Sequence, residues 1–339
     1  MALSGARAGC YSRRMRAYLK AVLWAYRLIL GREPTEEEVQ AHLGYPKLSD
    51  LRRAFFSCPE FRQRERYLCG PSLTGFEPAL LIEDAVEDAT LEKLLELTRL
   101  SWEHLGEHEP HWSVLSADEF KQANLDAHRE RFYASGQHSA EQFLNLLRRN
   151  GCLPEKLSDK RIIEYGCGVG RVTHALAQRF GEVRAYDISA PHLELARQFA
   201  ASLGLDNIRF AQIKRPQDVT QLPQADAVYT TIVLQHNPPP VIRFILKALL
   251  DALAPSGVAC FQLLTYQQGY AFSAEAYLRA SPEQGRRVVE MHVLPQRRVF
   301  EIIAQSGCRV LETLDDALAD YRGGDLSNTF LVQKQPAPD

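Results

Sequence analysis

The spacing of hydrophobic and polar positions changes along the chain. Up to about residue 68, apolar residues recur every three or four positions, as in YLKAVLWAYRLILG, which predicts amphipathic helices. Residues 69–86 hold two glycines and two prolines and predict a linker, after which helical spacing returns as far as residue 155. After Lys160, short β-rich runs alternate with amphipathic runs. This change predicts a parallel sheet with helices on both faces.

Capping residues suggest where several of these helices begin. Thr35 and Glu38 have the spacing of a capping box, just after a proline that should end the first helix. Ser139 and Gln142 have the same spacing and predict a new helix there. Asn237 is expected to cap the helix that begins in PPPVIRF, where a proline fits the first turn.

The α/β part of the chain is expected to hold seven strands. They are predicted near residues 161–165, 182–187, 207–212, 225–231, 257–264, 308–313 and 328–334. The predicted domains are a helical accessory domain (1–70), a linker with a helical lid or acceptor-binding segment (71–155), and an α/β domain (156–335).

Composition narrows the function classes without selecting one. The 339 residues carry a formal net charge of −2, so the chain as a whole has no pull toward nucleic acid. Seven cysteines show no CxxC pair and no zinc-ligand spacing, which fits a reducing cytoplasm. No apolar run approaches the roughly 20 residues of a membrane span. We expect a cytoplasmic protein, soluble or peripheral to the inner membrane.

The amino-terminal charge is locally uneven. The first 32 residues hold seven basic residues and no acid, since Glu33 is the first carboxylate. A basic amphipathic helix of this kind could lie on an anionic membrane, or it could pack on a core and leave a solvated basic side. An organelle transit peptide is a further reading of the same charge, but helical spacing runs straight into the following segment.

Three alternate glycines mark the strongest motif, RIIEYGCGVGR. Gly166, Gly168 and Gly170 stand between a predicted strand and a predicted helix, where bare backbone lets a ligand approach and a helix amino terminus offers N–H groups. A dinucleotide-binding turn would need glycine where Arg171 stands. The observed spacing is an acid, Glu164, one residue, then G-x-G-x-G.

This motif resembles the first motif of class I S-adenosylmethionine-dependent methyltransferases. The resemblance covers residues 160–334 and continues in VRAYDIS, QDVTQLP, ADAVYTTIVLQHNPP and LAPSGVACFQLL, although Ser256 replaces a glycine of the family pattern. It implies a Rossmann-like core with a seven-stranded, mostly parallel sheet, and S-adenosyl-L-methionine as cofactor. The glycines could instead form only a tight turn, and Asp187 could only cap a helix. The order of four motifs along the chain disfavours these structural explanations.

The resemblance also implies roles for individual residues. Asp187 would bond both ribose hydroxyls, Asp218 would accept from the adenine amine, and the Val219 backbone N–H would face a ring nitrogen. Tyr165 could stack near the sulfonium or simply pack under the sheet. A lid that excludes water is expected to use Trp112, Phe132 and Tyr133. The expected cofactor-binding residues are Glu164, Tyr165, Gly166, Cys167, Gly168, Gly170, Arg171, Asp187, Ile188, Asp218, Val219, Gln235 and Tyr133.

Residues 1–68 resemble a small helical domain of unknown function from bacterial proteins, some of which are linked to cell-surface glycans. The matching residues are Tyr26, the Leu-Gly-Arg-Glu-Pro run that ends at Pro34, and later Ser57, Glu60 and Phe61. The aspartate and the Gly-x-x-Tyr-Trp run of that family are missing here.

Methylation of an alcohol needs a base near the methyl group, most often histidine. His292 lies in an aromatic insertion after the fifth strand and is the first candidate, with Glu290 beside it to orient the ring or bind hydroxyls. His236 follows the fourth strand and is the second candidate. Each histidine could instead be only structural. His104, His108 and His111 have helical offsets that could hold a metal, but Pro110 should end the helix before His111, so no metal is expected.

These observations predict an S-adenosylmethionine-dependent methyltransferase that acts on a sugar hydroxyl of a bacterial surface polysaccharide. The alternatives are an O- or N-methyltransferase of a small natural product, and a scaffold that binds the cofactor without turnover. No nucleic-acid partner is expected, because NPPP at 237–240 lacks the aromatic residue of base-methylating enzymes.

Overall fold

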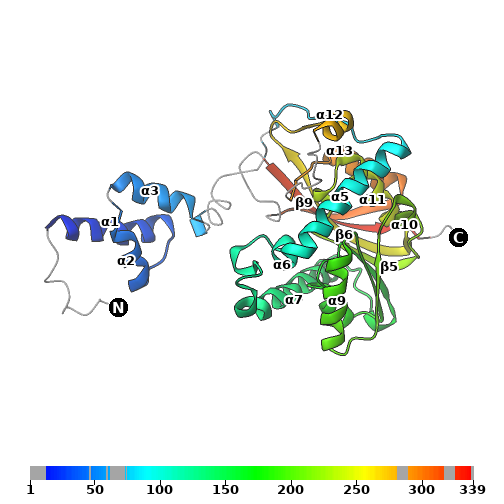
Figure 1. Ribbon diagram of the computed structural model, residues 1–339, viewed down its shortest axis with the longest axis horizontal. Helices are drawn as coiled ribbons and strands as arrows, with labels where there is room; N and C mark the ends of the chain where they lie inside the picture. Colours follow the sequence, from blue (N-terminus) through cyan, green and yellow to red (C-terminus); the bar gives the residue numbers. More distant parts are fainter. Residues whose placement is uncertain are drawn as a thin grey trace. The chain divides into compact units, whose positions relative to one another are not determined.

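The structure is a computed structural model that describes residues 13–45, 47–58, 60, 61, 73, 75–280, 289–316 and 325–336, with residues 13–17 described by backbone alone. The chain divides into two compact units, Met1–Pro71 and Ser72–Asp339 (Figure 1). The predicted lid segment and the α/β domain therefore belong to one unit.

The first unit is a small helical domain. Its helices are α1 (Arg13–Ile29), α2 (Glu36–Leu43) and α3 (Leu48–Ser57). Val22 and Tyr26 on one side of α1, and Leu30 just after its end, pack against Leu51 and Phe55 of α3. The predicted capping box is present, because Thr35 Oγ1 accepts from Glu38 N (3.2 Å) and Glu38 Oε2 accepts from Thr35 N (2.8 Å).

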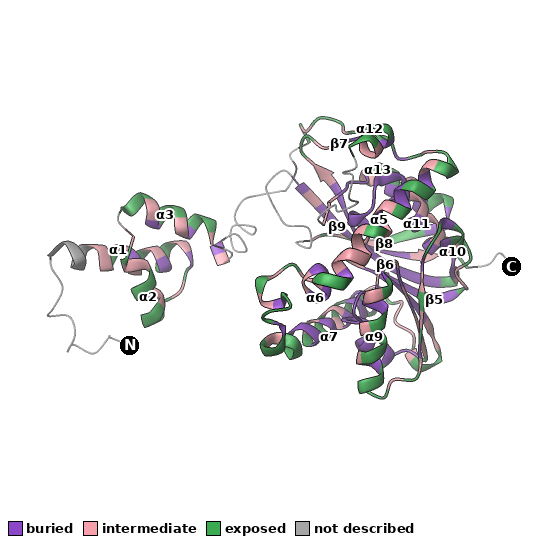
Figure 2. Ribbon diagram, viewed as in Figure 1, coloured by how far each residue is buried: buried purple, intermediate pink, exposed green. Residues whose placement is uncertain are grey.

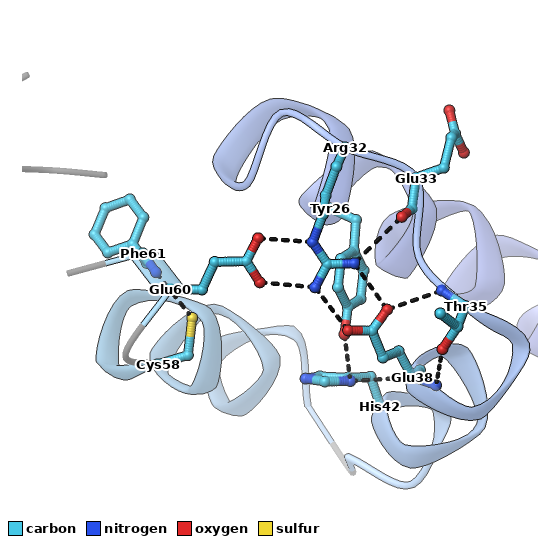
Figure 3. A network of polar contacts seen from close by, with 9 residues as sticks. All are labelled: Tyr26, Arg32, Glu33, Thr35, Glu38, His42, Cys58, Glu60 and Phe61. Carbon is cyan, nitrogen blue, oxygen red and sulfur yellow. Dashed lines mark hydrogen bonds and ion pairs between the residues drawn. The ribbon is translucent and has the colours of Figure 1, made fainter. Parts of the chain in front are cut away.

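One arginine ties this unit together (Figure 3). Arg32 donates from Nε and Nη2 to both oxygens of Glu60 (2.6 and 2.7 Å), and from Nη1 and Nη2 to Glu38 (2.9 and 2.6 Å). Its guanidinium lies 5.1 Å from the Tyr26 ring centroid. The Arg27 side chain pairs separately with Glu33 (2.7 Å). Residues far apart in the sequence are thus joined by charged hydrogen bonds.

The second unit is built on a seven-stranded sheet in the order β4-β3-β2-β5-β6-β9-β8. The first five of these strands are parallel to their neighbours, and β9 runs antiparallel to both β6 and β8. This is the expected Rossmann-like methyltransferase fold, so the predicted fold class is confirmed. The strands are β2 (Arg161–Tyr165), β3 (Glu182–Asp187), β4 (Ile208–Gln212), β5 (Ala225–Thr230), β6 (Leu253–Gln267), β8 (Cys308–Asp316) and β9 (Asp325–Lys334).

Helices cover both faces of this sheet (Figure 2). Ile163, Val228 and Phe261 face one core, and the adjacent Ile162, Ala227 and Cys260 face the other, because successive strand residues point to opposite sides. The first core packs on α5, α11 and α13, and the second on α7, α8 and α9. These helices are α5 (Asp88–His108), α7 (Leu125–Arg149), α8 (Thr173–Ala177), α9 (Ala190–Ser202), α11 (Pro239–Asp251) and α13 (Gln296–Gln305).

Shorter elements lie at the edges of the sheet. A two-stranded parallel pair joins β1 (Leu81–Ile82) to β7 (Ala271–Phe272), so the segment predicted as a linker contacts the insertion after β6. The remaining helices are α6 (Pro110–Val114), α10 (Pro216–Thr220) and α12 (Ala274–Arg279), with 3-10 turns at Asp118–Phe120, Leu157–Asp159 and Leu234–His236. Among the described residues, no helix combines the length and apolarity of a membrane span.

Two capping predictions were wrong. Ser139 lies inside the continuous helix α7, where its hydroxyl donates to Ser135 O (3.2 Å). A Cβ on Gly136, one turn earlier, would lie 1.7 Å from Arg171 O, so this glycine allows close packing within the helix. The Asn237 amide donates to Val233 O (3.0 Å) instead of capping α11.

Candidate cofactor and acceptor site

A cavity that is partly open to solvent lies at the carboxyl ends of β2, β3 and β5. Ligands of open α/β sheets bind at this edge. The lining includes eight of the residues expected to hold a cofactor, namely Glu164, Tyr165, Gly166, Cys167, Gly168, Arg171, Asp187 and Ile188.

The glycine turn forms the floor of the cavity and needs its glycines. Gly166 has φ +77° and Gly168 has φ +53°, in the left-handed region. A Cβ on Gly166 would lie 2.4 Å from Val233 Cγ2, and one on Gly168 would lie 2.8 Å from Val114 Cγ2. Both positions are therefore closed to any side chain without movement of the cavity wall.

Asp187 holds the turn in place with its carboxylate. Oδ2 accepts from Gly168 N (2.7 Å) and Oδ1 accepts from Ser189 N (2.8 Å). A carboxylate has about four acceptor positions, so each oxygen keeps a further lone pair for a ligand hydroxyl. Asp187 is at once a support of the glycine turn and a ligand-facing group of the cavity.

A buried acid and a buried base of the lining have unsatisfied atoms. Glu164 Oε2 and Arg171 Nε have no hydrogen-bond partner, although the residues are only 3% and 6% exposed. Burial raises the pKa of Glu164 to about 8 and lowers the pKa of Arg171. Arg171 Nη1 is held by Ser135 Oγ (3.1 Å) and Ser139 Oγ (3.2 Å) of α7. Buried polar groups of this kind indicate a missing polar ligand.

Helices α5 and α6 supply the wall above the turn. Thr98, Trp102, Ser113 and Val114 line the cavity. The expected lid residues Trp112, Phe132 and Tyr133 are not in this lining. Tyr133 instead packs behind the turn, where its ring stacks on Phe199 (3.5 Å between centroids) and its hydroxyl donates to Val169 O (3.4 Å).

The three candidate catalytic residues form one cluster beside the cavity rather than in its lining, with both histidines buried and Glu290 half-buried. His236 Nδ1 lies 2.8 Å from Glu290 O, and the His236 ring lies 5.4 Å from the ring of Trp102, which lines the cavity. His292 N donates to Gln235 O (2.7 Å). The His236 ring is therefore one aromatic contact away from the cofactor cavity.

Two tyrosines of the insertion complete this cluster. His292 Nδ1 lies 2.8 Å from Tyr270 Oη, and His292 Nε2 lies 3.5 Å from Glu290 Oε2. Tyr277 donates its hydroxyl to the same Glu290 oxygen (2.7 Å). Burial lowers the pKa of His236 to about 4, so its imidazole is neutral at pH 7.

Other expected cofactor residues stand outside the lining. Asp218 Oδ2 accepts from Lys214 N (2.9 Å) and Arg215 N (3.1 Å) and thereby closes its own turn. Val219 is fully buried in the core, and Gln235 Oε1 accepts from Gln262 Nε2 (2.7 Å). Gly170 faces Ala196 of α9. Contacts of these residues with adenine or ribose stay predictions.

Sequence reasoning missed two structural features of the cavity wall. Ile232 has φ +59°, which is costly for a β-branched residue, and its N–H donates to Gln262 Oε1 (2.9 Å). His192 lies between Ser113 Oγ (2.9 Å from Nε2) and Ser189 Oγ (2.7 Å from Nδ1). No local motif signals either feature, because both depend on contacts with distant parts of the chain.

Comparison with known proteins agrees with this arrangement. Residues 162–257 match the family model of a methyltransferase domain. The match agrees with the expected methyltransferase class, whose expected cofactor is S-adenosylmethionine. It spans the glycine turn, Asp187 and the strand that leads to His236. It does not reach the first unit, whose resemblance to a glycan-associated domain is not shown.

The chain is also similar to curated proteins that are named O-methyltransferases. The chain is 30% identical over 131 residues to a ubiquinone biosynthesis O-methyltransferase of Stutzerimonas stutzeri (strain A1501), covering 37% of this chain and 55% of that protein. It is 30% identical over 102 residues to the protein of the same name from Aeromonas salmonicida (strain A449), covering 30% and 42%. The chain thus spans about half the length of these relatives, and none of the names supports a polysaccharide acceptor.

Solved structures of similar fold are more distant. One is a magnesium protoporphyrin IX methyltransferase from Synechocystis PCC 6803 with bound SAH, at 18% identity and TM-score 0.43, with 66% of this chain and 99% of that chain covered. Another is an S-adenosylmethionine-dependent methyltransferase from Clostridium acetobutylicum ATCC 824, at 15% identity and TM-score 0.42, with 57% and 89% covered.

Proposed function

We propose that this chain is an S-adenosylmethionine-dependent O-methyltransferase whose acceptor is a small molecule with an acidic hydroxyl, such as a phenol. The observation that carries the proposal is the pair of unsatisfied buried groups, Glu164 Oε2 and Arg171 Nε, in one cavity with Asp187. S-adenosylmethionine supplies, when bound, a methyl group on a sulfonium that is already a good leaving group.

The cavity fits the polar ends of this cofactor. An amino-acid zwitterion offers an ammonium to the Glu164 carboxyl and a carboxylate to the Arg171 guanidinium, and so removes two buried unpaired groups. The remaining lone pairs of Asp187 suit a ribose diol. The bare backbone at Gly166 and Gly168 lets the chain of the cofactor lie against the turn.

His236 is the better candidate for the base that takes the acceptor proton. Its Nδ1 faces the carbonyl of Glu290, which can only accept, so the proton is on Nδ1 and the lone pair is on Nε2. His292 Nδ1 faces the Tyr270 hydroxyl, and His292 Nε2, which has no hydrogen-bond partner, lies 3.5 Å from Glu290 Oε2. The His292 ring packs on Tyr270, Phe272 and Tyr277 rather than on a residue of the cavity lining. This reverses the order in which the sequence ranked the two histidines and gives His292 and Glu290 a positioning role.

A weak base favours an acidic acceptor. Burial keeps the pKa of His236 near 4, far below that of any hydroxyl. A phenol, with a pKa of about 10, loses its proton to such a base far more readily than an aliphatic alcohol does. The O-methyltransferase names of the curated relatives support oxygen as the methylated atom. The sugar hydroxyl expected from the sequence is the second acceptor class to test.

We further propose that the enzyme is cytoplasmic and contacts a membrane through α1. Trp24 and Leu28, one turn apart on the side of α1 opposite its core residues, are 53% and 77% exposed. Lys20 and Arg27 flank them, and α1 contains no acid. Aromatic and aliphatic side chains with flanking cations suit an anionic lipid surface. Trp24→Ala should reduce cosedimentation with vesicles rich in anionic lipid, whereas equal binding by wild type and variant would contradict this contact.

The first experiment is calorimetric titration of the full chain with S-adenosylmethionine and S-adenosylhomocysteine, followed by methyl transfer to phenols and to sugars. Binding near one site per chain and transfer to phenols are expected. Transfer to sugars alone would overturn the acceptor proposal, and binding without turnover on either class would favour the scaffold alternative. Folded protein that binds neither cofactor form would overturn the proposed function.

A further inference from the structure

The outer face of α5 carries a cluster of metal-ligating side chains away from the cofactor cavity. His104, Glu107 and His108 each offer a ligand atom, and these atoms lie within 4.8 Å of one another. Offsets of three and four residues place them on one side of the helix. His111, which the sequence had grouped with the two histidines, is not part of the cluster, because it is buried with Nε2 3.3 Å from Tyr133 Oη.

The His108 imidazole is oriented for coordination. His108 Nδ1 lies 2.8 Å from His104 O, so Nδ1 carries the proton and Nε2 keeps the lone pair. A backbone carbonyl on the far nitrogen is the usual support of a metal-bound histidine. The rings of His104 and His108 lie 4.1 Å apart between centroids, so the second imidazole is within reach of the same ion.

The size and the chemistry of the cluster fit a transition-metal ion. Bonds of about 2.0–2.1 Å at tetrahedral angles place ligand atoms roughly 3.3 Å apart. The side chains of Glu107 and His108 are exposed and can rotate to close the difference. Two imidazole nitrogens with one carboxylate oxygen suit Zn²⁺ or Co²⁺, whereas Mg²⁺ and Ca²⁺ prefer oxygen ligands alone.

We propose that the last two turns of α5 bind a Zn²⁺-type ion through His104, Glu107 and His108, with solvent in the remaining position. The opposite side of the same turns belongs to the cavity wall: Trp102 lines the cavity, and a Cβ on Gly106 would lie 2.7 Å from His192 Nδ1. The bound ion therefore links side chains in the last two turns of α5, a helix that also forms part of the cofactor cavity wall. Because the ion binds the folded protein, it stabilises that state relative to the unfolded one.

The test uses the full chain without an affinity tag, after treatment with a chelator. Calorimetric titration with Zn²⁺ and visible absorption on addition of Co²⁺ should give one ion per chain, with an affinity in the micromolar range. His108→Ala and His104→Ala should each weaken binding at least tenfold and abolish the rise in melting temperature caused by Zn²⁺. His138→Ala, at another exposed histidine of a helix, is the matched control and should bind as wild type does.

Circular dichroism of the free variants separates loss of binding from loss of fold, since both substituted side chains lie outside the hydrophobic core clusters. Binding unchanged in His104→Ala and His108→Ala, or equally weakened by His138→Ala, would overturn the site. Wild-type protein that shows no stoichiometric binding would do the same. None of these results depends on methyl transfer, so the metal site is tested independently of the proposed function.

Discussion

Burial gives Glu164 a protonation state that cofactor binding should change. The pKa of its carboxyl is raised to about 8, mainly by burial, with Asp187 acting in the same direction and Thr173 and Arg171 opposing it. At pH 7 a group with this pKa is protonated in about nine molecules out of ten. The free protein should therefore present a neutral acid, not a carboxylate, to the cavity.

An ammonium beside this carboxyl favours its ionised form. If the bound cofactor returns the pKa of Glu164 to its ordinary value of about 4.5, binding at pH 7 releases about 0.9 proton per site. The same linkage makes the affinity depend on pH: between about pH 4.5 and pH 8, each rise of one pH unit should strengthen binding up to about tenfold, and the effect should level off outside this range.

Calorimetry measures this proton directly. Titrations at pH 7 in phosphate and in Tris differ in observed enthalpy by the number of released protons times the difference in buffer ionisation enthalpy. Wild type should give about 0.9 and Glu164→Gln close to zero, with weaker but measurable binding. Glu182→Gln, a surface carboxylate paired with Arg161 and Arg184, should behave as wild type does. Release that is absent from wild type, or equal in Glu164→Gln, would refute the assignment of the ammonium to Glu164.

Three further predictions concern the ribose, the base and the first unit. Asp187→Asn, which keeps an acceptor for one backbone N–H, should weaken cofactor binding by about 10- to 100-fold in calorimetry with the circular dichroism spectrum unchanged. His236→Ala should lower kcat by about 10²- to 10⁴-fold and spare cofactor affinity, whereas His292→Gln should chiefly alter the pH profile; equal effects of the two would contradict the order given to them. Arg32→Met should destabilise the first unit by about 1 kcal/mol, measured by urea unfolding of the full chain. This difference should vanish as the pH falls from about 4.5 toward 2. The reason is that the pKa of Glu38 is lowered to about 2 in the folded state, so the stabilisation from its ionised form is lost in that pH range.

The parts of the site that could be predicted from sequence are those set by local backbone requirements. Gly166 and Gly168 adopt left-handed conformations and have no space for a Cβ, so few other residues could stand there. Asp187 ends a strand whose register places it beside the turn. Short β-rich runs between amphipathic runs likewise predicted all seven strands. In these cases the residues that form the sequence pattern are the same residues that require the local structure.

The parts that could not be predicted depend on contacts between distant residues. Ile232 is held in a left-handed conformation by Gln262, thirty positions away. The tautomer of His236 is set by the carbonyl of Glu290, and the orientation of His292 by Tyr270. Pattern and spacing place such histidines near the sheet edge, but they do not reveal which ring nitrogen is free to accept a proton.

In the first unit, the charged residues of the sequence motif have a structural role. Arg32 and Glu60, two of the residues on which the resemblance to the glycan-associated domain family rests, bond to each other, and Glu38 completes the network (Figure 3). Bidentate pairing and the Tyr26 ring leave little of the guanidinium for a ligand. The spacing of these residues is thus accounted for by the packing of three helices. A glycan ligand is not needed to explain it, so the acceptor is better sought from the chemistry of His236 and the cofactor cavity than from the first unit.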